Sequence, residues 1–337
     1  MRLSRRTIVI GSCPVAAAAV VAGAGLVLSG CSSPAKPGHA PPPQATQPAT
    51  PLVSPFTGEP VRALGPVLAA KIDNIVLARP QTGLTKADIV YLIPVEGGLS
   101  RFLAVFSSHF PPVIGPVRSA REDDLELLRQ FGTPAFAFSG AQPQLLPVIE
   151  HARIVDLYDG RVGGYYRSPS RIAPYNLYAS TRRLLAEAPH ASKAHGIGFR
   201  FGPAPAGGQP AASYSVSYPA ASFTFRWSAK QASWLVWMDG APAASTEDGQ
   251  LGAPTVVVQY TKVGTSRYLE AGKRPPYAST VGSGRAVVLR NGRSYSGHWS
   301  RPQADGGTTF TTAAGQPLTF ATGQVWIVLA YGPGSTG

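Results

Sequence analysis

Two carboxylates and four arginines in the first half of the chain have the residue types needed for anion binding or for acid–base chemistry. The carboxylates are Asp73 and Glu96, and the arginines are Arg79, Arg101, Arg118 and Arg121. A guanidinium group pairs with a carboxylate or a phosphate through two parallel hydrogen bonds. Two carboxylates in one cleft could instead serve as the acid and base of a hydrolase or transferase. Both chemistries require these side chains to converge.

The segments around the carboxylates favour special positions, although each also has a plain structural interpretation. Asp73 stands at the C-terminal end of an apolar run that predicts a strand, and α/β sheets commonly bind ligands at such strand ends. Alternatively, Asp73-Asn74 only shapes a turn. Glu96 precedes Gly97-Gly98, which favours a tight two-residue hairpin turn with Arg101 diagonally across from Glu96. If exposed, a Glu96–Arg101 ion pair at a hairpin end would contribute well under ~1 kcal/mol.

Residues 115–121 predict the start of a helix beside two of the arginines. Ser119 followed by Glu122 is the pattern of a capping box. Backbone N–H groups at a helix start attract anions, and Arg118 and Arg121 would flank such a ligand. Alternatively, Ser119 only caps the helix, and the acids that follow it only complement the helix dipole. Asn176, in the string 173–178, completes the candidate ligand-binding residues.

Several classes of site are not expected. The chain has no Gly-x-Ser-x-Gly elbow and no P-loop, and its one Ser-x-x-Lys, Ser33 to Lys36, lies in a proline-rich segment. His190 and His195 are five residues apart, so they would not share a helix face, and the six histidines show no zinc spacing. We therefore expect no metal and no cofactor.

Cys31 predicts where the protein resides. It closes the lipobox Leu-Ser-Gly-Cys, which follows three arginines and an apolar stretch at residues 7–28. This order is typical of a lipoprotein signal peptide, here residues 1–30, that is cleaved before a lipidated cysteine. The expected location is the outer face of the cell membrane, through a lipid anchor. The alternatives are an uncleaved membrane helix and, for export, a twin-arginine signal around Arg5-Arg6.

The charge indicates an anionic environment. The formal net charge is +13, and loss of residues 1–30 removes three arginines and no acid, which leaves +10. Outside the cytoplasm such a basic surface meets anionic lipids and wall polymers, so we expect no nucleic-acid partner. Because Cys13 lies in the signal and Cys31 would be lipidated, the mature chain has no cysteine for a disulfide, a zinc site or a nucleophile.

Two domains are expected after a proline-rich tether at residues 31–56. Residues 57–200 mix strand and helix signals, with apolar runs at 67–72, 89–95 and 99–106 and helical patterns such as 122–131, which predicts an N-terminal α/β layer domain. A Gly/Pro/Ala linker at 202–212 leads to residues 213–332, which predict a mainly-β domain, either sandwich or barrel, with a hairpin turn at Asn291-Gly292. All five tryptophans fall there, as core residues or as a sugar-stacking platform.

Several strings of this chain resemble the YerB-like bacterial lipoprotein family. They are Asp73-Asn74, 79–84, 87–91, 96–102, 115–121 and 173–178, with looser matches at 281–284, 297–299 and 323–326. The resemblance implies a lipoprotein with paired N- and C-terminal domains and no assigned activity. This chain departs from the family at Tyr91-Leu92, where Tyr-Glu is frequent, and at Tyr175, where histidine is frequent. A mechanism that uses this histidine as a base could not operate unchanged here.

These features together predict a lipid-anchored factor of the cell envelope that binds an anionic wall or lipid component through its arginines. The alternative is a wall-active hydrolase or transferase that uses Asp73 and Glu96. A cleft that holds both carboxylates among the arginines would favour the enzyme, whereas arginines on an open face would favour binding.

Overall fold

The computed structural model describes residues 51–247 and 249–335. Cys31, the predicted signal peptide and most of the predicted tether lie outside these residues. Phe56, at the end of the tether range, is fully buried in the core. In the described part of the chain, no helix is long and apolar enough to cross a membrane.

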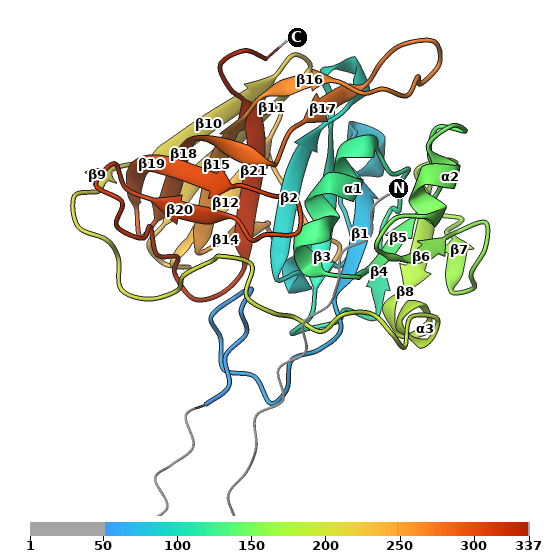
Figure 1. The fold of residues 1–337 in the computed structure, drawn as a ribbon, viewed down its shortest axis with the longest axis horizontal. Coiled ribbons are helices and arrows are strands. Elements are labelled where there is room, and N and C mark those ends of the chain that lie inside the picture. The colour runs from blue at the N-terminus through green and yellow to red at the C-terminus, as the bar shows by residue number, and fades with distance from the viewer. Residues whose placement is uncertain (1–50, 248, 336–337) are drawn as a thin grey trace, which may run out of the picture. The chain divides into compact units, whose positions relative to one another are not determined.

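One sheet of eleven strands organises the structure (Figure 1). Its order is β20-β19-β18-β15-β21-β2-β3-β1-β5-β6, and β9 also pairs with β19. The bounds are β1 Leu68–Asp73, β2 Ile89–Pro94, β3 Ser100–Phe106, β5 Ala135–Phe138, β6 Val155–Tyr158, β9 Gln209–Pro210, β15 Thr255–Thr261, β18 Gly282–Arg290, β19 Arg293–Arg301, β20 Thr309–Thr311 and β21 Val325–Tyr331. Strand β21 pairs in parallel with both β15 and β2, and so joins the two halves of the chain.

The central strands are apolar along their whole length because both faces of the sheet are covered. All residues of β1, β2 and β3 are buried, which explains why they appear in the sequence as continuous rather than alternating apolar runs. The hairpin β18–β19 turns at Asn291-Gly292, where both residues have positive φ, 51° and 67°. This is the turn that the Asn-Gly pair predicts.

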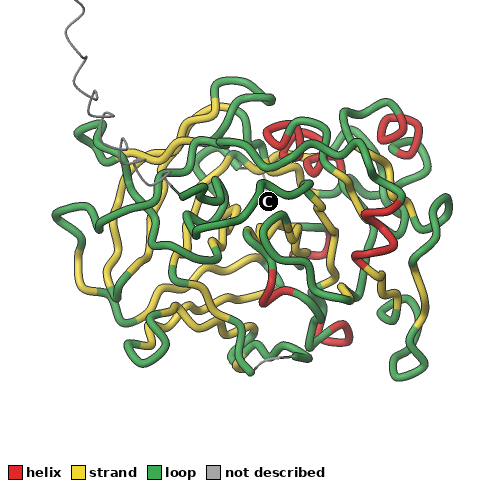
Figure 2. The backbone as a smooth tube through the Cα atoms, turned by 90° about the horizontal axis from the view of Figure 1, so that it is seen from below, coloured by secondary structure: helices red, strands yellow, loops and turns green. Residues whose placement is uncertain are grey.

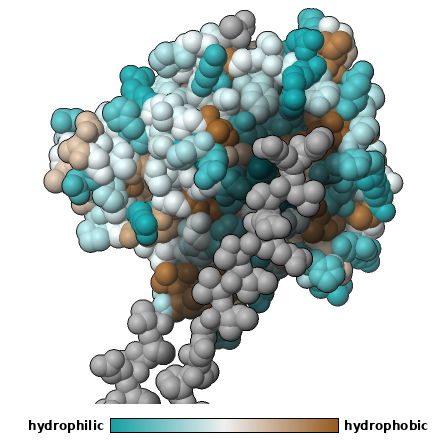
Figure 3. Space-filling view, viewed as in Figure 1, coloured by the Kyte–Doolittle hydropathy of each residue, from teal (hydrophilic) through white to brown (hydrophobic). Residues whose placement is uncertain are grey.

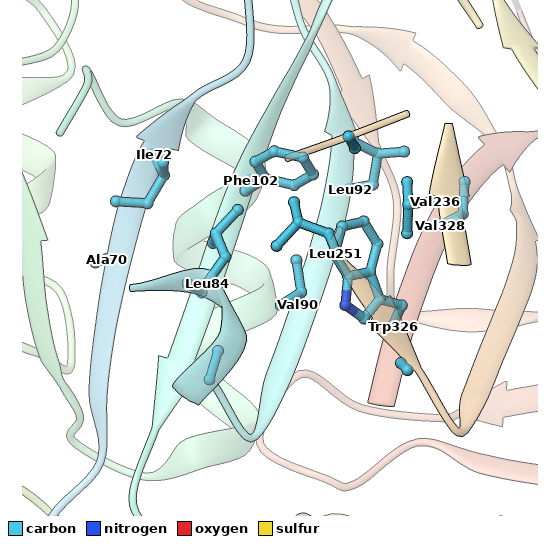
Figure 4. Packing of buried hydrophobic residues seen from close by; sticks show 14 of the residues in the cluster. Ala70, Ile72, Leu84, Val90, Leu92, Phe102, Val236, Leu251, Trp326 and Val328 are labelled. Atoms are coloured by element: carbon cyan, nitrogen blue, oxygen red, sulfur yellow. The ribbon is translucent and has the colours of Figure 1, made fainter. Parts of the chain in front are cut away.

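A second sheet of five strands packs on one face of the large sheet. It contains β10 Ser213–Tyr218, β11 Ala221–Ser228, β12 Ser233–Met238, β13 Ala241–Pro242 and β14 Gly252–Ala253. Between the sheets, Trp326 of β21 packs edge-on against Phe102 of β3, with ring centroids 5.5 Å apart, and near Val236 of β12 (Figure 4). Trp234 and Trp326 are among the largest fully buried side chains.

Small elements cover the rest of the large sheet. A three-stranded sheet of β4 Val113–Ile114, β8 Leu177–Ser180 and β7 Tyr165–Arg167 contributes to the core on the side of the five-stranded sheet, as does α3 Thr181–Ala186. The opposite face is covered by α1 Glu122–Leu128 and α2 Leu146–Glu150, with the hairpin of β16 Val263–Thr265 and β17 Pro276–Ala278 beside α1. The surface visible in Figure 3 is mostly hydrophilic, with apolar residues in small separate patches.

The prediction of an N-terminal α/β layer domain is wrong, because the described chain is mostly β (Figure 2). The three α-helices have only five to seven residues and cannot cover a sheet as layers. Gly132, with φ 77°, follows the short 3-10 turn that extends α1, and Pro189 stands three residues after the end of α3. Such residues limit helix length, so short apolar stretches between strands were no sign of helical layers.

Residues 57–200 and 213–332 both contribute strands to the large sheet. The predicted linker between them carries β9, which pairs with β19, and Gly208 lies so close to the Tyr295 ring that a Cβ there would meet it at 2.4 Å. The boundaries of the two domains therefore remain a prediction, and the large sheet contains strands from both ranges.

Candidate functional site

The C-terminal end of β1 brings the predicted site residues together. Asp73 is the last residue of β1 and lies opposite Arg101 of β3 in the antiparallel register. Residues 115–118 run beside the same end, because Asp73 N–H donates to Pro116 O at 2.9 Å and Arg118 N–H donates to Lys71 O at 2.8 Å. On its other side this segment bonds β8, since Val117 N–H donates to Leu177 O. The segment before β8 is thereby brought to the same place.

Glu96 reaches this place from the turn between β2 and β3. The turn is one residue longer than predicted: Val95 N–H donates to Leu99 O, and Glu96, Gly97 and Gly98 form the loop. Gly98 packs against the β10–β11 turn, and its carbonyl accepts from Ala220 N–H at 2.9 Å. The second half of the chain therefore holds the turn that carries Glu96.

These elements surround a cleft of about 200 Å³. Its charged side chains are two acids and two arginines, and the rest are apolar, aromatic or hydroxyl groups. The lining residues are Asp73, Ile75, Val95, Glu96, Leu99, Ser100, Arg101, Arg118 and Tyr175. Four of the predicted site residues thus converge on one small cleft.

Arg118 is held at the mouth of the cleft from two sides. Its Nε donates to Asp73 Oδ2 at 2.9 Å, and its guanidinium carbon lies 5.7 Å from the centre of the Tyr175 ring. Asp73 is almost fully buried, and its Oδ1 accepts from Asn74 N–H. Among the described residues, no acceptor is bonded to either Nη of Arg118, whose side chain is 24% exposed. The two Nη groups, which form the outer fork of this guanidinium, are therefore available to a ligand.

Glu96 is a carboxylate fixed in its ionised form. Its Oε1 accepts from Nη2 of Arg101 and of Arg121, and its Oε2 accepts from Arg121 Nε at 2.9 Å. Burial acts to raise the pKa of Glu96, but the Arg121 hydrogen bond and the charges of Arg101 and Arg121 outweigh it and lower the pKa to about 2. Glu96 therefore carries no proton to donate near neutral pH.

Arg101 is the most deeply placed cation of the cleft. Its Nη1 donates to Ser119 O at 3.0 Å, and its buried Nε has no partner among the described residues. Burial, followed by the positive charge of Arg121, lowers the pKa of Arg101 to about 10. Leaving a buried guanidinium N–H unsatisfied costs free energy, and a bound ion or water is one way to satisfy it.

The helix start differs from the prediction at Ser119. Helix α1 begins at Glu122 with Arg121 as its N-cap residue, and Arg121 N–H donates to Asp124 Oδ2 at 2.7 Å. Ser119 therefore does not cap the helix, and it supplies its backbone carbonyl to Arg101 instead. Asp124 also accepts from Lys71 Nζ at 2.5 Å, in an ion pair that is fully buried.

Four predicted residues do not line the cleft. Arg121 and Ser119 bond its lining residues Glu96 and Arg101, whereas Arg79 and Asn176 have other partners. Arg79 donates to the carbonyl of Asn74 at 2.8 Å and pairs with Asp239 at 2.8 Å, beside a separate apolar groove of about 470 Å³. Asn176 accepts from Arg167 and donates to Ser168 O, and so braces the β7–β8 hairpin. Both residues support the segments around the cleft.

The uncharged wall of the cleft was not predicted from the sequence. Ser100 accepts from Asn74 Nδ2 at 2.9 Å, and Tyr175 lies under Arg118. Tyr175 carried a usable signal, because it is the position where the resembling family frequently has histidine. In residues 51–247 and 249–335, no three His, Cys, Asp or Glu side chains are placed to hold a metal ion.

The fold and the site define a mostly-β protein in which two sequence domains share one sheet beside a small cleft of balanced charge. The chain belongs to the family described as protein of unknown function DUF3048. The N-terminal domain of that family matches residues 56–195, and its C-terminal domain matches residues 214–327.

Individual relatives of the chain agree with this family assignment. A Bacillus subtilis (strain 168) protein named "Putative lipoprotein YerB" is 36% identical over 137 residues, which are 38% of this chain and 40% of the relative. This chain thus matches about two fifths of the length of that relative. The crystal structure of YerB from Bacillus subtilis has a TM-score of 0.71 at 23% identity, and the match covers 83% of this chain and 96% of that chain. The YerB-like family that the sequence indicated is confirmed.

Proposed function

We propose that this protein is a lipoprotein anchored through Cys31 at the extracytoplasmic face of the cell membrane, where its cleft binds an anionic group of a wall or lipid component. The lipobox at residues 28–31 and the name of the Bacillus subtilis relative support the anchor. The net positive charge of the chain supports an anionic envelope partner, and nucleic acid is not part of the proposal.

The outer fork of Arg118 carries the binding proposal. Asp73 and Tyr175 fix this guanidinium through its Nε and its flat face, so both Nη groups are oriented before a ligand arrives. Two parallel N–H groups suit one carboxylate or one phosphate. Because the side chain is already held, little conformational entropy is lost on binding.

The geometry favours binding over the catalytic alternative. Both carboxylates line the cleft, as a hydrolase or transferase would need, but each is already bonded on both oxygens. Glu96, with its pKa of about 2, cannot serve as a general acid near neutral pH. The frequent histidine of the family is Tyr175 here, so the cleft also lacks that base.

Arg118→Lys and Arg118→Gln test the binding proposal. In the full-length protein in detergent, both substitutions should weaken the binding of acetate or inorganic phosphate by about tenfold or more, because lysine has no fork. Calorimetric titration measures the affinity, and thermal unfolding should change little in Arg118→Lys, which keeps a cation beside the buried Asp73. Arg226→Gln is the matched control. Arg226 stacks on Trp237 in the five-stranded sheet, so this substitution removes one positive charge at a place away from the cleft.

Unchanged binding in both Arg118 variants would disprove the cleft as the anion site. The anchor is tested separately by Cys31→Ala, which should leave uncleaved precursor and abolish labelling by a fatty-acid analogue. Persistent labelling would contradict the role of Cys31.

A further inference from the structure

The charges that line the cleft sum to zero, which restricts what can bind there. Arg101 and Arg118 are balanced by Asp73 and Glu96, and all four side chains line the same space of about 200 Å³. Arg121, which bonds Glu96 but does not line the cleft, lies 3.7 Å from the carboxylate of Glu270, so the wider cluster is balanced too. A dianion would bring uncompensated negative charge next to two carboxylates in a partly buried site, where charge is poorly screened. A ligand with one positive and one negative group brings no net charge.

Each half of such a ligand has an available partner. The two Nη groups of Arg118 are free of protein acceptors among the described residues and suit a carboxylate. A carboxylate oxygen has two lone pairs, and Glu96 Oε2 accepts only from Arg121 Nε, on a side chain that is 31% exposed. Glu96 can therefore accept one more N–H, and its ionised form suits an ammonium group.

The remaining wall limits the size of the ligand and requires an apolar part. Ile75, Val95 and Leu99 line the cleft together with the Tyr175 ring. Ser100, whose Oγ accepts from Asn74, keeps its hydroxyl hydrogen to donate. A space of about 200 Å³ is below the usual range of drug-sized ligand pockets and suits one small group.

We infer that the cleft recognises a zwitterionic α-amino-acid group, with its carboxylate on Arg118, its ammonium on Glu96 and a small side chain against Ile75, Val95 and Leu99. This inference rests on the proposed function, since the carboxylate is the anionic group that the cleft binds. The zwitterionic group belongs either to a free amino acid or to the head of a serine-containing lipid, and both keep the ammonium and the carboxylate.

The first test compares ligands that carry one or both charges. In calorimetric titrations of the full-length protein, alanine should bind at least about tenfold more tightly than acetate, methylammonium or inorganic phosphate. If acetate or phosphate binds as tightly as alanine, the zwitterion is disproved while anion binding stands. If none of these compounds binds, the proposed function fails as well.

The second test uses Glu96→Gln, which should move two affinities in opposite directions. Alanine binding should weaken by about tenfold, because the ammonium loses its charged acceptor, whereas acetate binding should strengthen, because a repelling carboxylate is gone. A merely structural effect would weaken both, and that result would overturn the inference. Arg226→Gln serves again as the control that should change neither affinity.

The source of the amino-acid group is tested by comparing the affinities of serine and glycerophosphoserine. Glycerophosphoserine carries the same zwitterion on a phosphodiester. Tighter binding of glycerophosphoserine than of serine would identify a lipid head as the ligand, and the reverse would identify a free amino acid.

Discussion

Strand β1 carries two charged clusters that differ in how completely they are closed. Lys71 and Asp124 form an ion pair in which both side chains are 0% exposed. Two residues further on, Asp73 pairs with Arg118, whose side chain is 24% exposed and keeps an open fork toward the cleft. The closed pair is shielded from solvent and contributes only to the stability of the fold. The open pair keeps hydrogen-bond donors that a ligand can reach.

The closed pair should show the largest effect on stability. Lys71→Met leaves Asp124 buried without its cation and should lower the free energy of unfolding by about 3–5 kcal/mol. Urea denaturation measures this. Lys71→Met combined with Asp124→Leu removes both charges and should recover part of the loss, although Arg121 N–H then loses its acceptor. A loss below about 1 kcal/mol in the single variant would show that the pair is not closed to water.

The turn that carries Glu96 should show an intermediate effect. Gly98→Ala places a Cβ 2.7 Å from Pro219 Cβ and 2.8 Å from Ala220 N, at a φ of 70°, and should cost about 1–3 kcal/mol. Gly97→Ala is a matched control, because its φ is 73° but its Cβ would meet nothing closer than 3.8 Å. Gly98→Ala should therefore be the more destabilising in urea. Equal losses would mean that only the backbone conformation matters and that the contact between the halves contributes little.

The pH dependence should show the smallest effect, and it belongs to the open cluster. The pKa of Glu96 falls from its ordinary value of 4.5 to about 2 in the folded protein, so the folded state binds fewer protons than the unfolded state between these values. The stability that Glu96 contributes is thus present above about pH 4.5 and is lost as the pH falls toward 2. Glu96→Gln should flatten this part of the stability profile, measured as the urea midpoint against pH. An unchanged slope would show that Glu96 is not held by its arginines in solution.

The site was more predictable from the sequence than the fold. Asp73, Glu96, Arg101 and Arg118 were identifiable because each stands next to a strand end or a special turn. Arg79 was not separable from them, since its partner Asp239 lies 160 residues away, in the turn that follows β12. Ser119 was misread because the acid at position 124 caps the helix through Arg121 N–H, and a Ser-x-x-Glu pattern cannot exclude this competitor.

The fold was less predictable because apolar strands do not specify their neighbours. Residues 325–331 and 89–94 both consist of apolar runs that suit any central position in a sheet. Their pairing joins segments more than 200 residues apart, and no local pattern encodes it. Helical patterns such as residues 122–131 indicated helical layers, but glycine ends this helix after its short 3-10 turn, and the helix is too short to form a layer.

The position of β21 gives the chain an order of assembly. Until residues 325–331 have been synthesised, β2 and β15 each present an unpaired, apolar strand edge. The two parts of the central sheet then have no strand between them. A chain of this design exposes two apolar strand edges to aggregation until β21 is in place, and its central sheet is completed in one late step.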